Sequence, residues 1–423
     1  MGHRALPKTL IVKDLLPLLK SRIPGPRSRA LARQLRQYES RNITYVTEHW
    51  PIFWRRASGA NVWDVDGNRY VDLTAAFGVA SVGHGNPRVV AAVKAQAGEL
   101  MHAMGDVHPN ELKAQLAREL VALTFGRWEK SQGRVIFANS GAEAVAAALK
   151  TAAIHTTRPG VIAFEGAYHG LTYGALDTTW RAGFRTPFSK QLGHFTAHVP
   201  FGRLPEVANI KEFGAVIVEP IQGRGGIVVP PDDFLPKLRK FCDEHRLVLI
   251  LDEIYTGFCR TGKWFASEHW GVVPDVVCVG KAMAGGFPMS ACVGRAEVMD
   301  SWPESNGEAI HTSTFLGNPL GCAAALAAID EMKRMKLDAR SRELGNWLVK
   351  RLAEIGKVRG KGLMLGVEVG NAVPIVEKLL RRGVLALPEG NRGEILGVTP
   401  PLVITKRQLE YFVKAMTELI RRS

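Results

Sequence analysis

The sequence is poor in cysteine and has no long apolar run. Only 5 of the 423 residues are cysteines, and no two form a CxxC pair, which excludes a disulfide scaffold and gives no support for a zinc ribbon or a redox motif. The longest apolar runs, such as residues 247–251, are too short to cross a bilayer. Asp14, Lys20 and Arg22 interrupt the one candidate for a secretory signal. We therefore expect a cytoplasmic protein with no membrane partner.

Acidic residues are also scarce relative to basic ones. The chain has 40 Asp and Glu against 55 Lys and Arg, which gives a formal net charge of +15. The basic residues are spread along the chain, so we expect general attraction of small anions and no nucleic-acid partner. A nucleic-acid-binding protein is the alternative from another class, and its binding would depend strongly on salt. The hydrophobic content of 46% excludes a disordered chain.

The middle of the chain, residues 75–328, alternates short β-branched apolar runs with helical patterns. Such alternation predicts an α/β fold with a mostly parallel, doubly wound sheet. The expected helices include 142–155, which is rich in alanine, and 234–245, which has an apolar stripe. The expected strands are 134–138, 161–164, 215–218, 247–251, 276–279 and 291–293.

The two ends of the chain have a different pattern. Asp66-Gly67 lies between alternating apolar residues and predicts a hairpin within residues 61–72. A helix is expected over 320–335, followed by strands at 363–369 and 395–398. We expect both ends to pack together as a smaller α+β domain. The predicted division is 1–72 (N-terminal arm and part of the small domain), 73–325 (large domain) and 326–423 (C-terminal part of the small domain).

Chemically reactive side chains follow the predicted strands, at the sheet edge where ligands of α/β proteins bind. Ser140 opens a helix, Asp252 and Glu219 each end an apolar run, Tyr168 follows another strand, and Lys281 follows 276–279. Taken singly, each has an ordinary explanation, such as a helix cap for Ser140 or a solvated lysine. Together they supply a phosphate anchor, an anion, an aromatic face and an amine, which are the groups that pyridoxal phosphate needs.

Several motifs, in order along residues 40–420, resemble those of the class III aminotransferases. The strongest is LDEIYTGFCRTG at 251–262, followed by Pro274-Asp275, Gly280-Lys281 and Gly285-Gly286-Phe287-Pro288. The other matching segments are 63–67 (WDVDG), 83–84 (GH), 140–144 (SGAEA), 168–170 (YHG), 219–220 (EP) and 314–319 (TFLGNP). The resemblance implies the fold of the type I pyridoxal-phosphate transferases, a family that includes ornithine and 4-aminobutyrate aminotransferases.

The resemblance implies a role for each matching residue. Lys281 would hold the cofactor covalently and, once freed, carry a proton between substrate and cofactor. Asp252 would keep the pyridine nitrogen protonated. The remaining cofactor contacts implied are Ser140, Gly141 and Ala142 at the phosphate, Tyr168 and His169 at the ring, Glu219 near the ring substituents, and Thr314 at the phosphate of a neighbouring subunit. A site shared in this way implies a homodimer, with a tetramer as a further possibility.

Two positions depart from the family pattern. Tyr255 replaces the usual glutamine near the cofactor's 3′ oxygen, where a phenol can still donate one hydrogen bond. Gly397 stands where many members have an arginine that binds the substrate α-carboxylate, and Arg224 replaces the glutamate that often gates it. We expect open space at Gly397, carboxylate binding by Arg224, and an apolar entrance wall that includes Trp54.

The sequence therefore predicts an aminotransferase that moves an amino group from a primary amine or ω-amino acid to a keto acid, pyruvate or 2-oxoglutarate, by a ping-pong mechanism. The cofactor expected is pyridoxal 5′-phosphate, and no metal is expected. Two alternatives stay open: an aminomutase of the glutamate-1-semialdehyde type, and a 4-aminobutyrate or ornithine aminotransferase proper.

Overall fold

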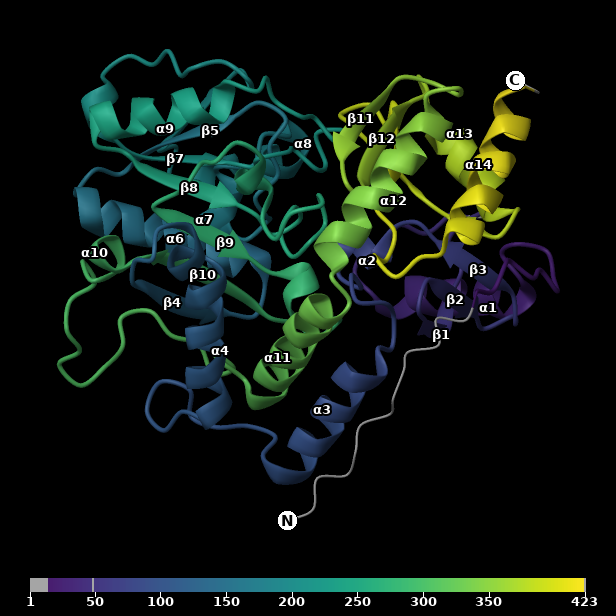
Figure 1. Ribbon diagram of the computed structural model, residues 1–423, viewed down its shortest axis with the longest axis horizontal. Helices are drawn as coiled ribbons and strands as arrows, with labels where there is room; N and C mark the ends of the chain where they lie inside the picture. The colour runs from purple at the N-terminus through teal and green to yellow at the C-terminus, as the bar shows by residue number, and fades with distance from the viewer. Residues whose placement is uncertain (1–13, 48, 422–423) are drawn as a thin grey trace.

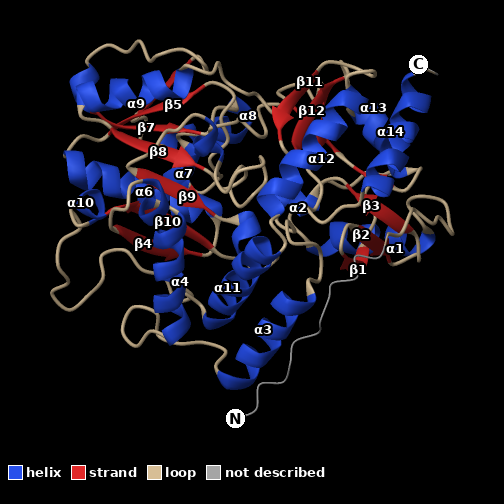
Figure 2. Cartoon of the chain, viewed as in Figure 1, coloured by secondary structure: helices blue, strands red, loops and turns tan. Residues whose placement is uncertain are grey.

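The computed structural model describes residues 14–47 and 49–421, so residues 1–13 of the predicted N-terminal arm lie outside the described part of the chain. The chain forms two lobes that lie side by side (Figure 1). The larger lobe contains one seven-stranded sheet, and the smaller lobe contains two four-stranded sheets. In Figure 2, helices surround the strands of the large lobe.

The large sheet is parallel except for one strand. Its order is β4-β10-β9-β8-β7-β5-β6, and only β10 runs antiparallel to its neighbours. The strands are β4 (Gly133–Ala138), β5 (Gly160–Phe164), β6 (Thr196–Val199), β7 (Phe213–Val218), β8 (Val248–Asp252), β9 (Val276–Val279) and β10 (Ser290–Arg295). Every residue of β8 and β9 is buried, as expected for central strands covered on both faces.

Helices pack on both faces of this sheet because alternate strand residues point to opposite sides. Helix α6 (Gly141–Thr156), rich in alanine, packs on the face that carries Ile217 and Ile250. Helix α9 (Phe234–His245) covers the opposite face through an apolar stripe. The other helices of this lobe are α3 (Pro87–Glu99), α4 (Glu111–Leu123), α5 (Phe125–Trp128), α7 (Tyr173–Leu176), α8 (Ala182–Arg185), α10 (Ala296–Met299) and α11 (Pro319–Arg334).

The smaller lobe is built from both ends of the chain. Strand β13 (Val384–Leu385) pairs in parallel with β3 (Arg69–Asp72), which confirms that the two ends pack together. The hairpin predicted at Asp66-Gly67 joins β2 (Asn61–Asp64) to β3. The other elements are α1 (Pro26–Tyr38), β1 (Trp54–Ser58), α2 (Ala75–Gly78), α12 (Leu337–Leu352), β11 (Val358–Lys361), β12 (Met364–Glu368), α13 (Val373–Leu380), β14 (Leu387–Glu389), β15 (Ile395–Val398) and α14 (Lys406–Ile420).

The predicted strands and helices are present, with ends that differ by two residues at most. The sequence interpretation did not identify β6, a short strand at the sheet edge that contains Thr196 and His198. Helix α11 continues without a break through residue 325, so the domain boundary predicted there lies inside a helix. The division into domains stays a prediction.

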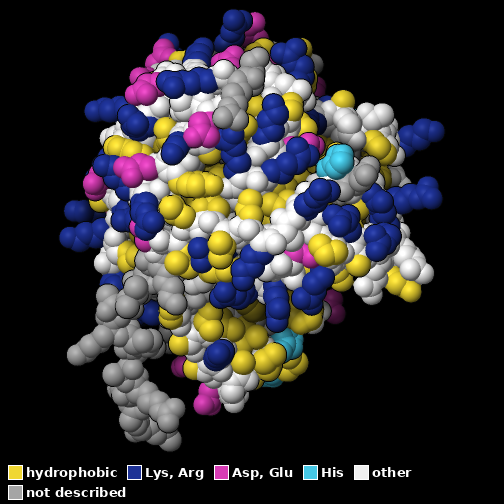
Figure 3. All heavy atoms as spheres, turned by 90° about the vertical axis from the view of Figure 1, so that its right-hand side faces the viewer, with side chains coloured by type: hydrophobic (Ala, Val, Ile, Leu, Met, Phe, Trp, Pro, Cys, Tyr) yellow, Lys and Arg dark blue, Asp and Glu magenta, His cyan; other side chains and the backbone are white. Residues whose placement is uncertain are grey.

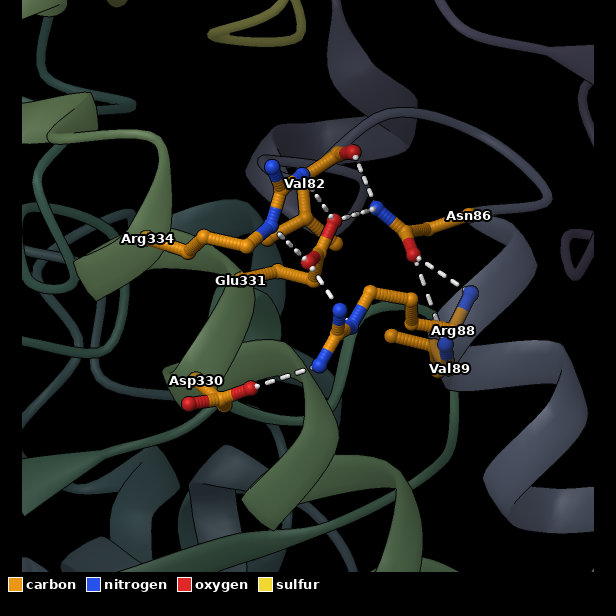
Figure 4. A network of polar contacts seen from close by, with 7 residues as sticks. All are labelled: Val82, Asn86, Arg88, Val89, Asp330, Glu331 and Arg334. Atoms are coloured by element: carbon orange, nitrogen blue, oxygen red, sulfur yellow. Dashed lines mark hydrogen bonds and ion pairs between the residues drawn. The ribbon is translucent and has the colours of Figure 1, made fainter. Parts of the chain in front are cut away.

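A buried carboxylate fixes α3 against α11. Glu331 on α11 is fully buried and contacts Arg334 Nε at 2.6 Å, Arg88 Nε at 3.1 Å and Asn86 Nδ2 at 3.2 Å (Figure 4). Asn86 is also the N-cap of α3. Burial acts to raise the pKa of Glu331, but hydrogen bonds from Arg334 and Asn86 bring that pKa below its ordinary value. The carboxylate is therefore held as an anion between the two helices.

Substitution Glu331→Gln is expected to lower the free energy of unfolding by about 2 kcal/mol, because two arginines lose their carboxylate partner and both are only partly exposed. Urea unfolding at pH 7 measures this change. Because the folded pKa is lowered, the difference should shrink as the pH falls through that pKa. The control is Asp330→Asn, an exposed partner of the same Arg88, with an expected change below about 0.5 kcal/mol. Equal effects of the two substitutions would contradict this role.

Basic side chains are distributed over the face that carries the smaller lobe, with acidic and apolar side chains among them (Figure 3). Among residues 14–47 and 49–421, no helix has the length and apolar character needed to cross a membrane. The same part of the chain has no group of three or more His, Cys, Asp or Glu side chains arranged to hold a metal ion.

Candidate active site

The carboxyl ends of the parallel strands surround a cavity of about 500 Å³. Residues after β4, β5, β7, β8 and β9 reach it, because parallel strands deliver their ends to one edge of the sheet. The side chains and backbone at its wall belong to Ser140, Gly141, Ala142, Tyr168, His169, Gly170, Leu171, Thr172, Glu219, Arg224, Asp252, Ile254, Tyr255 and Lys281. The structure thus brings together ten of the thirteen residues predicted for the site.

The N-terminus of α6 points its free N–H groups at this cavity. Ser140 is the N-cap, and its hydroxyl accepts a hydrogen bond from the N–H of Glu143 at 3.4 Å. Gly141 and Ala142 occupy the first turn, where backbone N–H groups have no partner within the helix. These N–H groups and the positive end of the helix dipole favour an anion such as a phosphate.

Asp252, the last residue of β8, presents a carboxylate to the cavity. Its Oδ2 atom lies 2.8 Å from His169 Nδ1, and its Oδ1 atom accepts the N–H of Ile254 at 3.1 Å. Each oxygen retains a lone pair, so the carboxylate can accept a further proton donor from the cavity. His169 is buried, and its Nε2 atom has no hydrogen-bond partner among the described residues. Its Nδ1 contact holds the carboxylate in place.

Lys281 supplies a buried amine at the start of a 3₁₀ turn after β9. Burial lowers the pKa of Lys281 to about 8, although Asp252, Glu219 and Glu389 act to raise it. The amine therefore loses its proton more readily than an ordinary lysine, and the neutral form is a nucleophile. The backbone of Lys281 has a φ of 43°, a left-handed conformation that is costly for a non-glycine residue and that recurs at functional sites.

Tyr255 forms the wall beside this amine. The Lys281 Nζ atom lies 3.7 Å from the centre of the Tyr255 ring. The ring fits because Gly78 and Gly223 have no side chains there; a Cβ on Gly78 would lie 2.6 Å from Tyr255 Cε2. The phenol oxygen lies 3.1 Å from Thr399 Oγ1. The hydroxyl group that we expected at a cofactor oxygen is thus hydrogen-bonded to Thr399.

Glu219 and Tyr168 form another part of the cavity wall. The Glu219 carboxylate accepts the N–H groups of Tyr168 and Gly223, both at 3.1 Å. Burial raises the pKa of Glu219 to about 7. The Tyr168 ring is a flat aromatic wall, and the Arg224 guanidinium lies 5.1 Å from its centre. Arg224 therefore reaches the cavity, as predicted.

Three predicted site residues do not line the cavity. Thr314 is exposed, and the neighbouring Ser313 accepts a hydrogen bond from Asn139 Nδ2 at 3.3 Å. This places the segment beside the start of α6. Trp54 lies on β1, is 43% exposed and packs edge-on against His84. The third is Gly397, on β15.

The expectation of open space at Gly397 is wrong. A Cβ at this position would lie 2.9 Å from Glu389 Cγ and 3.3 Å from the carbonyl oxygen of Leu387. The reason is the pairing of β14 with β15, which sets Leu387 opposite Gly397 and Glu389 opposite Ile395. Sequence interpretation missed Glu389, and no motif near that residue indicates its position.

The fold and this cavity define an α/β enzyme that places a lysine amine, a carboxylate and an anion-binding helix end together. Comparison with known proteins identifies the group. The family model for class III aminotransferases matches residues 44–420. The chain therefore belongs to the class III aminotransferases, as the motifs indicated, and it is an enzyme that transfers an amino group from an amine or ω-amino acid to a keto acid.

Individual relatives cover nearly the whole chain. An acetylornithine aminotransferase of Methanosarcina mazei is 39% identical over 90% of this chain and 94% of its own length. A putrescine aminotransferase of Pectobacterium atrosepticum is 36% identical, covering 90% of this chain and 85% of its own. The ornithine aminotransferase of Toxoplasma gondii, whose structure shows partial occupancy of PLP at its active site, is 32% identical with a TM-score of 0.83, covering 93% of this chain and 94% of its own.

Proposed function

We propose that this aminotransferase binds pyridoxal 5′-phosphate in the cavity and exchanges amino groups between a primary amine or ω-amino acid and pyruvate or 2-oxoglutarate by a ping-pong mechanism. The observation that carries the proposal is the arrangement of the Lys281 amine, the Asp252 carboxylate and the first turn of α6 around one cavity. A cavity of about 500 Å³ is within the range of small-ligand sites. The donor set therefore fits this cofactor.

Each wall of the cavity has a role in this proposal. Lys281 would form the covalent link, and the N–H groups of Gly141 and Ala142, with Ser140, would bind the phosphate. Asp252, held by His169, would pair with the ring nitrogen, and Tyr168 would hold the ring. Glu219 and Tyr255 would contact the remaining ring substituents. When bound, pyridoxal phosphate supplies an aldehyde and an electron-withdrawing ring.

Lys281 also carries the proton that the reaction must move. With pyridoxal phosphate bound, the Lys281 amine would act as general base and general acid, accepting the donor's proton at its Nζ atom and giving it back. Burial, which lowers the pKa of Lys281 to about 8, favours the neutral amine that can accept a proton. The Tyr255 ring limits where the Nζ atom can move.

A donor panel tests the proposed reaction. Monoamines, diamines, 4-aminobutyrate and ornithine are each paired with pyruvate and with 2-oxoglutarate, and the new amino acid is quantified. We expect turnover of at least one primary amine or ω-amino acid that requires a separate keto acid. Isomerisation of an amino aldehyde without any keto acid would instead show an aminomutase.

Arg224 is the proposed carboxylate-binding group for the keto acid. A guanidinium can bind a carboxylate through two parallel hydrogen bonds. Substitution Arg224→Ala is expected to raise the keto-acid KM about 30-fold, equivalent to about 2 kcal/mol for a charged hydrogen-bond partner, with a smaller change in kcat. Steady-state kinetics with both keto acids measure this effect, and the exposed Arg203→Ala is the control. An unchanged KM removes Arg224 from this role.

We also propose a homodimer, with a tetramer as its possible further association. An exposed apolar surface supports it: Met101, Met104, Val107, Ile310 and Phe315 are all more than half exposed. The ring of Phe315 packs on His102, so these segments form one surface. Such a patch marks an interaction site, and Thr314 lies within it. Sedimentation is expected at twice or four times the chain mass of 46.3 kDa, and a monomer would refute the dimer.

The proposed enzyme acts in the cytoplasm on small molecules, and we propose no nucleic-acid or membrane partner for it. Cell fractionation tests this placement, and recovery of the enzyme in a secreted fraction would contradict it. Within the division of the chain proposed above, the cavity lies in the large domain.

A further inference from the structure

The Lys281 amine has an aromatic ring as its direct neighbour in the cavity. In the described part of the chain, its Nζ atom has no hydrogen bond or ion pair, and it lies 3.7 Å from the centre of the Tyr255 ring. The carboxylates of Asp252 and Glu219 act on it at longer range, and each is held by two hydrogen bonds to other groups. A buried ammonium without a partner is unfavourable. The Tyr255 ring is therefore the partner that the described residues offer to this amine.

The Tyr255 ring is held so that a face is the part presented to the amine. One edge lies against Gly78, where a Cβ would be 2.6 Å from Tyr255 Cε2 and 2.8 Å from Cδ2. The other edge, at Cδ1 and Cε1, lies against Gly223. The hydroxyl lies 3.1 Å from Thr399 Oγ1, and the Thr399 N–H donates to the Leu73 carbonyl at 2.7 Å. Because both edges and the hydroxyl are occupied, a face of the ring remains for the amine.

A ring face suits the protonated form of the amine. The face of an aromatic ring carries the negative part of its quadrupole, and it attracts a cation that lies within about 6 Å of the ring centre. Burial raises the pKa of Tyr255, so the phenol stays neutral and the attraction comes from the π-system. Burial lowers the pKa of Lys281, and the ring face acts against this effect. The charged groups that also act on the pKa of Lys281 are Asp252, Glu219 and Glu389, which raise it, and Arg224, which lowers it.

We propose that the face of Tyr255 is the resting position of the Lys281 amine while the amine is not linked to the cofactor, and that the ring holds it there as the ammonium. This inference rests on the proposed function, because it concerns the amine that carries the proton. Tyr255 is then a positioning residue that acts through Lys281. The hydroxyl, bonded to Thr399, helps to anchor the ring.

The test changes the charge of the ring face and keeps its shape. Tyr255 is replaced by phenylalanine or by pentafluorophenylalanine, whose fluorine atoms withdraw electron density from the face. The pKa of Lys281 is measured in the full-length chain freed of cofactor, from the pH dependence of its acetylation by trace acetic anhydride, with the peptide quantified by mass spectrometry. In Tyr255→Phe we expect a pKa within about 0.3 of wild type. With pentafluorophenylalanine we expect it about one unit lower, a tenfold change in the ratio of ammonium to amine.

The control residue is Tyr38 on α1, which is 77% exposed. The same two replacements there should leave the pKa of Lys281 unchanged. Equal pKa values with phenylalanine and pentafluorophenylalanine at position 255 would overturn the proposal, because the charge of the face would then have no effect. A fall of one unit already in Tyr255→Phe would also overturn it, because the hydroxyl would then hold the amine.

If the fluorinated protein does not fold, Tyr255→Leu serves instead. This side chain has no aromatic face, so the pKa of Lys281 is again expected to fall. An unchanged or raised pKa in this variant overturns the proposal.

Transamination by the wild-type holoenzyme is assayed alongside. A pKa of Lys281 that follows the ring substitutions in a protein without transamination would refute the proposed function and leave the role of the ring intact. Transamination together with a pKa that does not depend on the ring would refute the role of Tyr255 alone.

Discussion

Substitution Lys281→Ala is expected to lower kcat by at least about 10⁴-fold. The variant loses the amine that links the cofactor and the group that carries the proton, and positioned general acid–base catalysis alone contributes about 10² to 10⁴ in rate. No other lysine lines the cavity in the described part of the chain. Single-turnover and steady-state rates with one donor and one keto acid measure the loss.

The matched control for this prediction is Lys240→Ala, a lysine on α9 whose side chain is 79% exposed. Its activity should equal that of the wild type. The Lys281→Ala protein is expected to keep its fold and to retain noncovalent cofactor binding through α6 and Asp252. Residual activity above about 0.01% of wild type, the level set by a 10⁴-fold loss, would show that another group moves the proton.

Substitution Asp252→Asn is expected to reduce kcat about 10³-fold with little change in size at the site. A neutral amide cannot keep a ring nitrogen protonated, so the cofactor ring would withdraw electrons less strongly. Loss of one preorganised electrostatic group typically costs about 10² to 10³ in rate. The substitution also puts a neutral amide in place of the carboxylate that lies 2.8 Å from His169 Nδ1. Rates of the amine half-reaction, followed by cofactor absorbance, measure the effect.

For this variant the control is Asp300→Asn, an exposed carboxylate that pairs with Arg134. It should turn over like the wild type. Circular dichroism separates a catalytic loss from unfolding. A kcat for Asp252→Asn within threefold of wild type would mean that the carboxylate does not act on the cofactor.

Much of the site follows from the order of strands and the residues that end them. Asp252 and Lys281 are predictable because each follows a continuous apolar run, and parallel strands bring such ends together. The positions of these two residues in the site can therefore be predicted from the local sequence. The strand β6 was missed because it is short, lies at the edge and includes polar residues such as Thr196.

Other features depend on contacts between distant segments. Glu389 lies against Gly397 only because β14 pairs with β15. The local sequence of neither strand specifies that pairing. The Tyr255 ring occupies a slot made by Gly78 and Gly223, far apart in the chain. A glycine in a sequence does not tell which side chain occupies the space it leaves, and this is why the expectation at Gly397 failed.

The most direct test of the account is the position of the covalent link. The holoenzyme is reduced with borohydride and digested, and the peptides are analysed by mass spectrometry. A cofactor-derived mass is expected on Lys281 and on no other lysine. A modification at a different lysine, or none in an enzyme that is active, would contradict it.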